Sequence, residues 1–219
     1  MGSSAPRRLI PPRPPADFPS IALDPVTSRQ TVWFRLARAA YSSPLFFSRQ
    51  GIFRFDSDTA KWGVCYLAQD IPTAVMEVFA DRIRARRLDY SELEEELVWK
   101  ITVPHDLNLL QLAGPTLTKI KATVQCFVSR YALSQEWGRA LMNHPADLDG
   151  VIYTGRQSGL PCLALFGDMN PAKGRWHQHA LTQACLGKLT AWEQFYPLLA
   201  KTGARVLNLP AKPPLKTWR

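Results

Sequence analysis

Several features that would assign this 219-residue sequence to a class at once are missing from it. No apolar run approaches the roughly 18 residues that a membrane-spanning helix requires. The first 20 residues are rich in proline and arginine and lack the apolar segment of a secretory signal. No internal repeat is present. We therefore expect a cytoplasmic protein without a membrane segment.

Cysteine is scarce, and its spacing shows no pairs. Each cysteine stands singly in an apolar or helical context: Cys65, Cys126, Cys162 and Cys185. Such a pattern is typical of buried free thiols in a reducing compartment rather than of disulfides or a zinc site. His177 and His179 form the one close histidine pair, with no cysteine or carboxylate at ligand spacing. We therefore expect no metal site.

Acidic residues are outnumbered, because 27 Lys and Arg against 18 Asp and Glu leave a net charge of +9. An excess of this size fits nucleic acid, a small polyanionic ligand or an acidic partner protein. The cations are dispersed over the N-terminal tail, the helix that follows Glu77 and the C-terminus. This dispersal argues against a dedicated helix that reads a nucleic-acid groove.

The composition, 46% hydrophobic, is sufficient for one domain with a full core. Residues 1–22 lack periodicity and predict a tail or a partner-binding arm. The domain is expected over residues 23–210, with a loose basic tail at 211–219. Hydrophobic patterns predict strands at 31–38, 51–55, 63–68, 97–103, 108–112, 149–154, 161–166 and 204–209. Helices are predicted from Asp70, within 118–142 (one segment capped by Ser134) and at 191–201, and an irregular segment at 168–179.

The stretch from Gly51 to Asp81 predicts strand, loop, strand and helix. Asp70 can cap a helix whose first turn contains Pro72, where a missing N–H costs little. The helix carries an apolar stripe of Ile71, Ala74, Val75, Val78 and Phe79. Arg54 on the first strand, Tyr66 on the second and Glu77 beside the stripe could line a cleft. The same pattern also fits a surface arginine, a core tyrosine and a solvated glutamate.

Two further segments carry polar groups on predicted short elements. Arg35 stands among aromatic residues in the first strand, as an ion-pair partner or an anion ligand. Residues 149–166 predict a hairpin whose turn contains Gly155, Arg156, Gln157, Ser158 and Gly159. Glycines let a backbone approach a ligand closely, and the amides of a turn can bind an anion. By itself the segment is only a turn signal.

Taken in order, these segments resemble the RES domain family, named for an arginine, a glutamate and a serine. Its members are the toxins of bacterial toxin–antitoxin pairs, usually encoded with an Xre-type antitoxin. The resemblance spans roughly residues 31–167 and rests on WFRLAR (33–38), FRF (53–55), VCYLA (64–68), AVME (74–77), YALSQEW (131–137), DGVIYTGRQ (149–157) and CLALF (162–166).

The resemblance implies an α+β, ADP-ribosyltransferase-like single domain, with a cleft between two small mixed or antiparallel sheets and flanking helices. It implies that NAD⁺ is bound as a substrate, without a resident cofactor and without a G-x-G-x-x-G motif, which the sequence lacks. The implied reaction breaks the nicotinamide–ribose bond, with water or phosphate as acceptor, and depletes cellular NAD. Some relatives instead transfer ADP-ribose to a protein. The implied partner is an Xre-type or other neutralising protein, with nucleic acid contacted only through it.

The resemblance also implies roles for residues. Glu77 would stabilise the oxocarbenium ion that forms as the bond breaks. Arg54 and Arg35 would offer planar cations to the pyrophosphate. Tyr66, followed by Phe53 or Phe55, would offer nicotinamide an aromatic face.

The hairpin turn departs from the family pattern, because Gly155 occupies the position of the family serine. Ser158 is the nearest serine, so the chain uses Ser158, or does without a hydroxyl, or carries a replaced residue at 155. Position 155 is expected to project on the same face as Tyr153. A serine there would therefore reach the cleft, and Gly155→Ser is predicted to raise turnover. Gly155, Arg156 and Ser158 are expected among the residues that bind NAD. A catalytically impaired module that binds NAD or a partner is the alternative.

Overall fold

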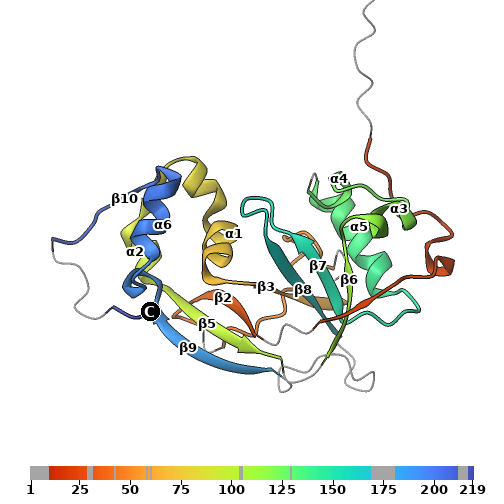
Figure 1. Ribbon diagram of the computed structural model, residues 1–219, viewed down its shortest axis with the longest axis horizontal. Coiled ribbons are helices and arrows are strands. Elements are labelled where there is room, and N and C mark those ends of the chain that lie inside the picture. The colour runs from red at the N-terminus through yellow and green to blue at the C-terminus, as the bar shows by residue number, and fades with distance from the viewer. Residues whose placement is uncertain are drawn as a thin grey trace, which may run out of the picture.

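The computed structural model describes residues 10–28, 32–41, 43–57, 59, 61–103, 106–128, 130–168, 181–211 and 217–219. A curved sheet forms the base of the molecule, and helices cover one of its faces in two groups (Figure 1). The irregular segment predicted at 168–179 lies almost entirely outside the described residues.

The large sheet has eight strands in the order β1-β6-β7-β8-β3-β2-β5-β9. They are β1 (Val26–Ser28), β2 (Val32–Arg38), β3 (Trp62–Ala68), β5 (Glu96–Thr102), β6 (Leu107–Gln111), β7 (Gly150–Thr154), β8 (Pro161–Asp168) and β9 (Thr182–Lys188). A small parallel sheet joins β4 (Arg87–Asp89) to β10 (Arg205–Leu207). The predicted α+β single domain is confirmed, with two sheets of unequal size.

The large sheet is nearly divided between β2 and β3. These strands are joined at one residue pair, Phe34 with Ala68. By contrast, β3 pairs with β8 along its whole length, from Trp62 to Ala68. The single pair lets the two halves of the sheet diverge, so one continuous sheet presents two separate surfaces to the helices.

The helices follow this division. Over one half lie α1 (Ile71–Arg84), α2 (Tyr90–Glu94) and α6 (Phe195–Thr202), and over the other α3 (Pro115–Lys119), α4 (Gln125–Val128) and α5 (Tyr131–Met142). Two short 3₁₀ helices, η1 (Phe18–Ser20) and η4 (Leu189–Ala191), complete the described helices. In Figure 1 the β7–β8 hairpin turn stands between α1 and the α3–α5 group.

Three clusters of buried side chains hold these layers together. One, with Val64, Trp137 and Phe166, lies between the sheet and α3–α5. A second, with Val75 and Phe195, joins α1, α6 and the other half of the sheet. The third, with Trp33, Cys65, Ile101, Leu109 and Leu165, lies on the opposite face of the sheet, since side chains alternate along strands. The first two clusters share a face, and the boundary between them falls at the end of β3.

Three local predictions were wrong for identifiable reasons. Residues 51–55 form turns instead of a strand, because Gly51 has φ of 69° and the N–H groups of Ile52 and Phe53 donate to Asp56. Ser134 does not cap a helix but lies buried within α5, where it donates to the carbonyl of Tyr131. The helix predicted at 191–201 is broken into η4 and α6.

Both predicted tails contribute to the domain. Phe18, only 1% exposed, packs edge-on against Trp137 and His144. The carbonyl of Pro12 accepts hydrogen bonds from the Trp137 indole and the Cys126 thiol. At the other end, residues 217–219 return to the domain through a bridge and ring stack to Trp192. The domain therefore extends beyond residues 23–210. At each end a single aromatic residue, Phe18 or Trp218, packs against the domain, and a single residue produces no periodic pattern in the sequence.

Candidate active site

Helix α1 presents Glu77 beside the hairpin turn. Asp70 caps the helix as predicted, since its Oδ1 accepts the Thr73 N–H at 2.8 Å. The apolar stripe buries Ala74, Val75 and Phe79, but Val78, predicted as part of it, is 46% exposed. Glu77 lies beside the stripe, half-buried, and points to the turn between β7 and β8.

The turn binds one oxygen of the Glu77 carboxylate. Glu77 Oε1 accepts the Gln157 N–H at 3.1 Å, the Ser158 N–H at 3.4 Å and the Ser158 hydroxyl at 3.4 Å. Among the described residues, Oε2 has no hydrogen-bond partner. The predicted hairpin is confirmed, and its turn is closed by the Gly155 N–H donating to the carbonyl of Leu160 at 2.9 Å. The arrangement anchors the carboxylate and leaves its second oxygen available.

Gly155 is buried at the point where the turn meets the carboxylate. A Cβ added there would lie 2.6 Å from Glu77 Oε1 and closer still to Ser158 Oγ. A side chain at position 155 would therefore project toward Glu77 and Ser158. The space for its side chain is already filled, however, so the expected gain from Gly155→Ser has no structural basis. Ser158, whose direction the sequence left open, delivers its hydroxyl to Glu77 instead.

Arg54 lies on the loop that replaces the predicted strand, and a buried carboxylate organises that loop. Asp56, 0% exposed, accepts at Oδ2 the Ser48 hydroxyl at 2.9 Å and the N–H groups of Ile52 and Phe53. The Gln135 side-chain amide of α5 donates to the carbonyls of Gly51 and Phe53. Hydrogen bonds within the loop and to α5 thus hold the residues next to Arg54 in place.

Tyr66 also fastens this loop. Its hydroxyl donates to Asp56 Oδ1 at 3.0 Å and accepts the Phe55 N–H at 2.9 Å. Its ring meets Phe53 edge-on, with centroids 5.7 Å apart. Burial, followed by the charge of Asp56, raises the pKa of Tyr66 well above its usual value, so the hydroxyl keeps its proton. Tyr66 acts as an anchor of the loop in this structure.

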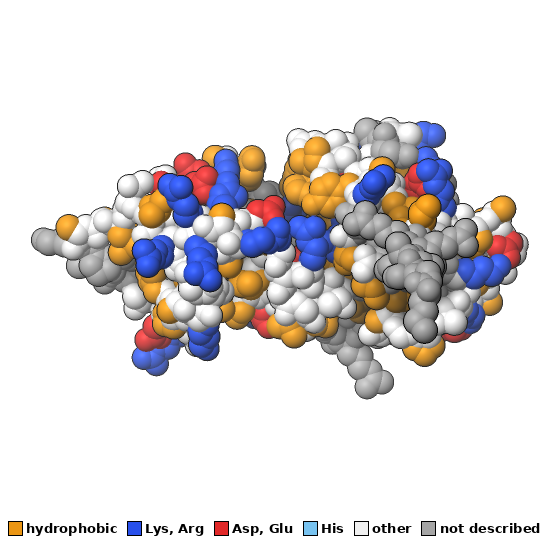
Figure 2. All heavy atoms as spheres, turned by 90° about the horizontal axis from the view of Figure 1, so that it is seen from above, with side chains coloured by type: hydrophobic (Ala, Val, Ile, Leu, Met, Phe, Trp, Pro, Cys, Tyr) orange, Lys and Arg blue, Asp and Glu red, His pale blue; other side chains and the backbone are white. Residues whose placement is uncertain are grey.

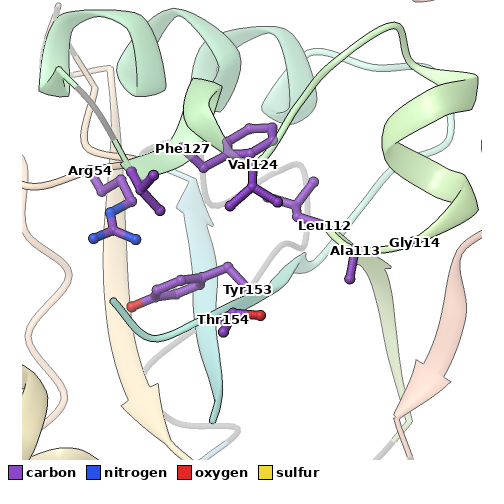
Figure 3. A pocket seen from close by; sticks show the side chains of 9 residues that line it. Arg54, Leu112, Ala113, Gly114, Val124, Phe127, Tyr153 and Thr154 are labelled. Atoms are coloured by element: carbon purple, nitrogen blue, oxygen red, sulfur yellow. The ribbon is translucent and has the colours of Figure 1, made fainter. Parts of the chain in front are cut away.

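Arg54 borders a small cavity of about 100 Å³. Its guanidinium carbon lies 5.4 Å from the centre of the Tyr153 ring, and Figure 3 shows it over the face of that ring. Apolar side chains of Leu112, Val124 and Phe127 line the opposite wall. Arg54 Nη1 is buried and has no hydrogen-bond partner among the described residues. A half-buried cation with one buried, unused donor is a candidate anion ligand.

The charges of Arg54 and Glu77 act on the same two groups. Burial raises the pKa of Cys162 to about 12, and the Glu77 charge adds to this rise while Arg54 opposes it. Burial also raises the pKa of Tyr153 well above its usual value, again with opposed contributions from Arg54 and Glu77. Cation, carboxylate and aromatic ring therefore share one region, where Cys162 stays a neutral thiol. Figure 2 shows the surface hollowed between two lobes, with Lys or Arg side chains across the narrow part.

Arg35 is not brought to this region. It shares the face of Trp33 on β2, and its Nη1 donates to the carbonyl of Phe46 and to Cys65 Sγ. Cys65 belongs to the opposite face of the sheet from Tyr66 and Tyr153, which pack on the α3–α5 cluster. Its assignment to the pyrophosphate stays a prediction from resemblance.

The remaining candidates differ in exposure. Phe53 is 46% exposed and Phe55 is fully buried, so of these two only Phe53 offers a ligand an accessible ring. Arg156 is exposed at the tip of the turn. The structure adds Asp56, Gln135 and Tyr153, none of which was predicted. Only Tyr153 gave a signal in the sequence, as an aromatic residue at the end of a strand that enters a glycine-rich turn.

Other kinds of site are not found in the described part of the chain. No group of three or more His, Cys, Asp and Glu there could hold a metal ion, and His177 and His179 lie outside it. None of the described helices combines the length and the apolar content that crossing a bilayer requires.

Comparison with known proteins agrees with this architecture. The RES domain family matches residues 32–185, and the chain belongs to this family. A chain of the M. tuberculosis MbcT–MbcA toxin–antitoxin complex is similar in structure, with a TM-score of 0.56 and 17% identity. That similarity covers 86% of this chain and 95% of the other, and the shared fold is ADP-ribosyltransferase-like. No curated protein matches the sequence.

Proposed function

We propose that this protein is a toxin that cleaves the nicotinamide–ribose bond of NAD⁺, with water or phosphate as acceptor. The observation that carries the proposal is the pairing of a carboxylate anchored through one oxygen with a half-buried guanidinium that keeps one buried nitrogen without a partner, in the same region. Membership of the RES domain family and the likeness to a chain of a toxin–antitoxin complex support the toxin role.

Arg54 binds the pyrophosphate in this proposal. A guanidinium offers several donors in one plane, and phosphate oxygens accept them in pairs. The Tyr153 ring supports the guanidinium from one side, which fixes its plane before a ligand arrives. The unused Nη1 donor then gains the partner that it lacks in the free protein.

Glu77 stabilises the transition state. As the bond breaks, its electron pair leaves with the nicotinamide nitrogen, and positive charge develops on the ribose carbon and ring oxygen. The free Oε2 of Glu77 offers a negative charge to that centre. Water or phosphate then adds to the ribose carbon, and water loses a proton in doing so. A group with this role is typically worth on the order of 10²–10³ in rate, about 3–4 kcal/mol.

The aromatic face is assigned to Tyr153 and Phe53 rather than to Tyr66 in this proposal. Tyr153 borders the cavity beside Arg54, and Phe53 is partly exposed on the Arg54 loop. The Tyr66 hydroxyl forms hydrogen bonds within that loop, and its ring packs edge-to-face against Phe53. Tyr66 therefore contributes by holding Phe53 and Arg54 in place.

A neutralising antitoxin is the proposed partner, by analogy with the complex to which this chain is similar. The net charge of +9 favours an acidic surface on that partner. Nucleic acid enters the proposal only through the antitoxin, and the reaction is placed in the cytoplasm. The impaired binding module is a weaker alternative, since a hydroxyl reaches Glu77 from Ser158 although Gly155 carries none.

The test is to incubate the purified protein with NAD⁺ and follow nicotinamide release by chromatography, with and without phosphate. ADP-ribose as product indicates hydrolysis, and its 1″-phosphate indicates phosphorolysis. Labelled NAD⁺ that modifies a protein in a cell lysate would instead support ADP-ribosyl transfer. NAD⁺ that binds but stays intact would favour the impaired module, and NAD⁺ that does not bind would overturn the proposal.

A further inference from the structure

The hairpin turn, whose role the proposed function does not specify, holds Glu77 through donors from two adjacent residues. Three contacts converge on Oε1, and two of them, the N–H and the hydroxyl, come from Ser158. The Ser158 hydroxyl oxygen also accepts the Leu160 N–H at 3.2 Å. Since a carboxylate oxygen can only accept and the Leu160 N–H can only donate, the hydroxyl donates its proton to Glu77 Oε1.

We propose that Ser158 and Gly155 form one positioning device for Glu77, an inference that rests on the proposed function. Ser158 supplies the hydroxyl that orients the carboxylate, and Gly155 supplies the space in which hydroxyl and carboxylate meet. Both residues are positioning residues, because they act through Glu77 and not on the substrate.

The steric argument shows why the two positions depend on each other. A Cβ at 155 would lie 2.6 Å from Glu77 Oε1, 3.0 Å from Glu77 Cδ and even closer to Ser158 Oγ. Carbon and oxygen do not approach this closely without a bond. A side chain at 155 therefore displaces the Ser158 hydroxyl, the Glu77 carboxylate or both.

Space, and not backbone freedom, is the reason for glycine at this position. Gly159 in the same turn has φ of +68°, in the left-handed region that favours glycine. Gly155 is not among the residues with positive φ, so an alanine there could adopt the backbone conformation. Substitution at Gly155 should consequently act on Glu77 locally, with little effect on the hairpin itself.

Anchoring Oε1 determines which oxygen meets the substrate. With the turn donors on Oε1, the carboxylate has one orientation, and Oε2 is the oxygen presented to the ribose. Without the Ser158 hydroxyl, or with a methyl group at 155, the carboxylate adopts several orientations. The rate of bond cleavage should then fall, whereas NAD⁺ affinity, which depends on Arg54, should change little.

The test compares Ser158→Ala, Gly155→Ala and the double variant in nicotinamide release, with Thr118→Ala, the loss of an exposed hydroxyl on α3, as control. We expect each single variant to lower kcat at least tenfold with KM within about threefold. The double variant should lose no more activity than the more impaired single variant, because both substitutions act through the same Glu77 carboxylate. Moving the serine with Gly155→Ser/Ser158→Ala should recover none of the loss in Ser158→Ala, because the added Cβ would still lie 2.6 Å from Glu77 Oε1.

A structural readout keeps this inference separate from the proposed function. In a crystal structure of Gly155→Ala, Glu77 Oε1 should have moved beyond hydrogen-bond distance of the Gln157 N–H. Suppose that the parent releases nicotinamide and the single variants do so equally fast, or that the kcat losses of the single variants multiply in the double variant. Either result would overturn the positioning role of Ser158 and Gly155 and leave the proposed function intact. If the parent is inactive, the function fails, and an unmoved Glu77 in the Gly155→Ala structure would overturn the inference as well.

Discussion

The guanidinium of Arg54 lies 5.4 Å from the centre of the Tyr153 ring and keeps one buried nitrogen without a hydrogen-bond partner in the described structure. The ring attracts the cation but cannot satisfy the N–H groups in its plane. Leaving such a donor unsatisfied costs roughly 1–3 kcal/mol. An anionic ligand removes this cost, which explains why a folded protein would keep Arg54 in this state.

Replacing Glu77 by glutamine should abolish most activity without harming the fold. Glutamine keeps an oxygen that can accept the Gln157 N–H, but it loses the charge that opposes an oxocarbenium ion. We expect nicotinamide release to fall on the order of 10²–10³-fold, with an unchanged melting temperature. Glu92→Gln, which removes an exposed partner of Arg82, is the matched control. Activity equal to that of the parent would show that Glu77 is not the stabilising carboxylate.

Replacing Arg54 should weaken NAD⁺ binding. Arg54→Ala removes hydrogen bonds to a charged group, worth about 1.5–3 kcal/mol, or roughly tenfold to 150-fold in affinity. Arg54→Lys keeps the charge but not the planar set of donors and should recover only part of the loss. Calorimetry in a Glu77→Gln background avoids turnover during the titration, with the exposed Arg156→Ala for comparison. Unchanged affinity for Arg54→Ala would exclude the pyrophosphate role.

The Arg54 loop should lose its order when Asp56 becomes asparagine. One acceptor oxygen becomes an NH₂ group that faces N–H or O–H donors from Ser48, Ile52, Phe53 or Tyr66. We expect a loss of about 1–3 kcal/mol in unfolding free energy for the unsatisfied groups, measured by urea denaturation, and a raised KM for NAD⁺. A stable Asp56→Asn protein with unchanged KM would mean that this network does not position Arg54.

Local sequence signals were sufficient for part of the site. The Asp70 cap, helix α1 and the β7–β8 hairpin are each encoded within about 20 residues, and all were predicted. The direction of the Ser158 hydroxyl depends on Glu77, which lies 81 residues earlier in the chain. The Arg54 loop likewise depends on Gln135, 84 residues beyond Gly51. Contacts between residues this far apart in the chain form only when the elements pack together. Hydrophobic periodicity therefore could not predict the Ser158–Glu77 contact or the contact of the Arg54 loop with Gln135.

The resemblance supplied the order of the motifs but not the faces on which they lie. Arg35 was grouped with Arg54 because both are arginines among aromatic residues. Strand alternation turns Arg35 toward Cys65 and away from Tyr153. Conversely, the sequence uses Tyr153 only to orient position 155, whereas the structure places its ring beside the guanidinium of Arg54.

Cys162 should make the protein less stable at alkaline pH. Burial, together with the Glu77 charge, raises the pKa of this thiol from 9.0 to about 12. Between these values the folded protein retains a proton that the unfolded chain releases, so the free energy of unfolding falls as pH rises. The slope for one group is at most about 1.4 kcal/mol per pH unit. It is absent below pH 9.0, where the thiol is protonated in both states.

Urea denaturation of the parent and of Cys162→Ser from pH 8 to 11 isolates this contribution. Serine does not titrate in this range, so the variant should lose stability less steeply above pH 9.0. Both proteins retain Tyr66, whose raised pKa acts in the same direction and cancels in the comparison. Part of the rise in the Tyr153 pKa comes from Cys162 itself, so the variant also loses that part, which makes its slope shallower still. Equal slopes would show that the Cys162 thiol is not held protonated, and that the charge of Glu77 does not reach it. The arrangement of carboxylate, cation and ring around Tyr153 would then need revision, because Cys162 reports on the same field.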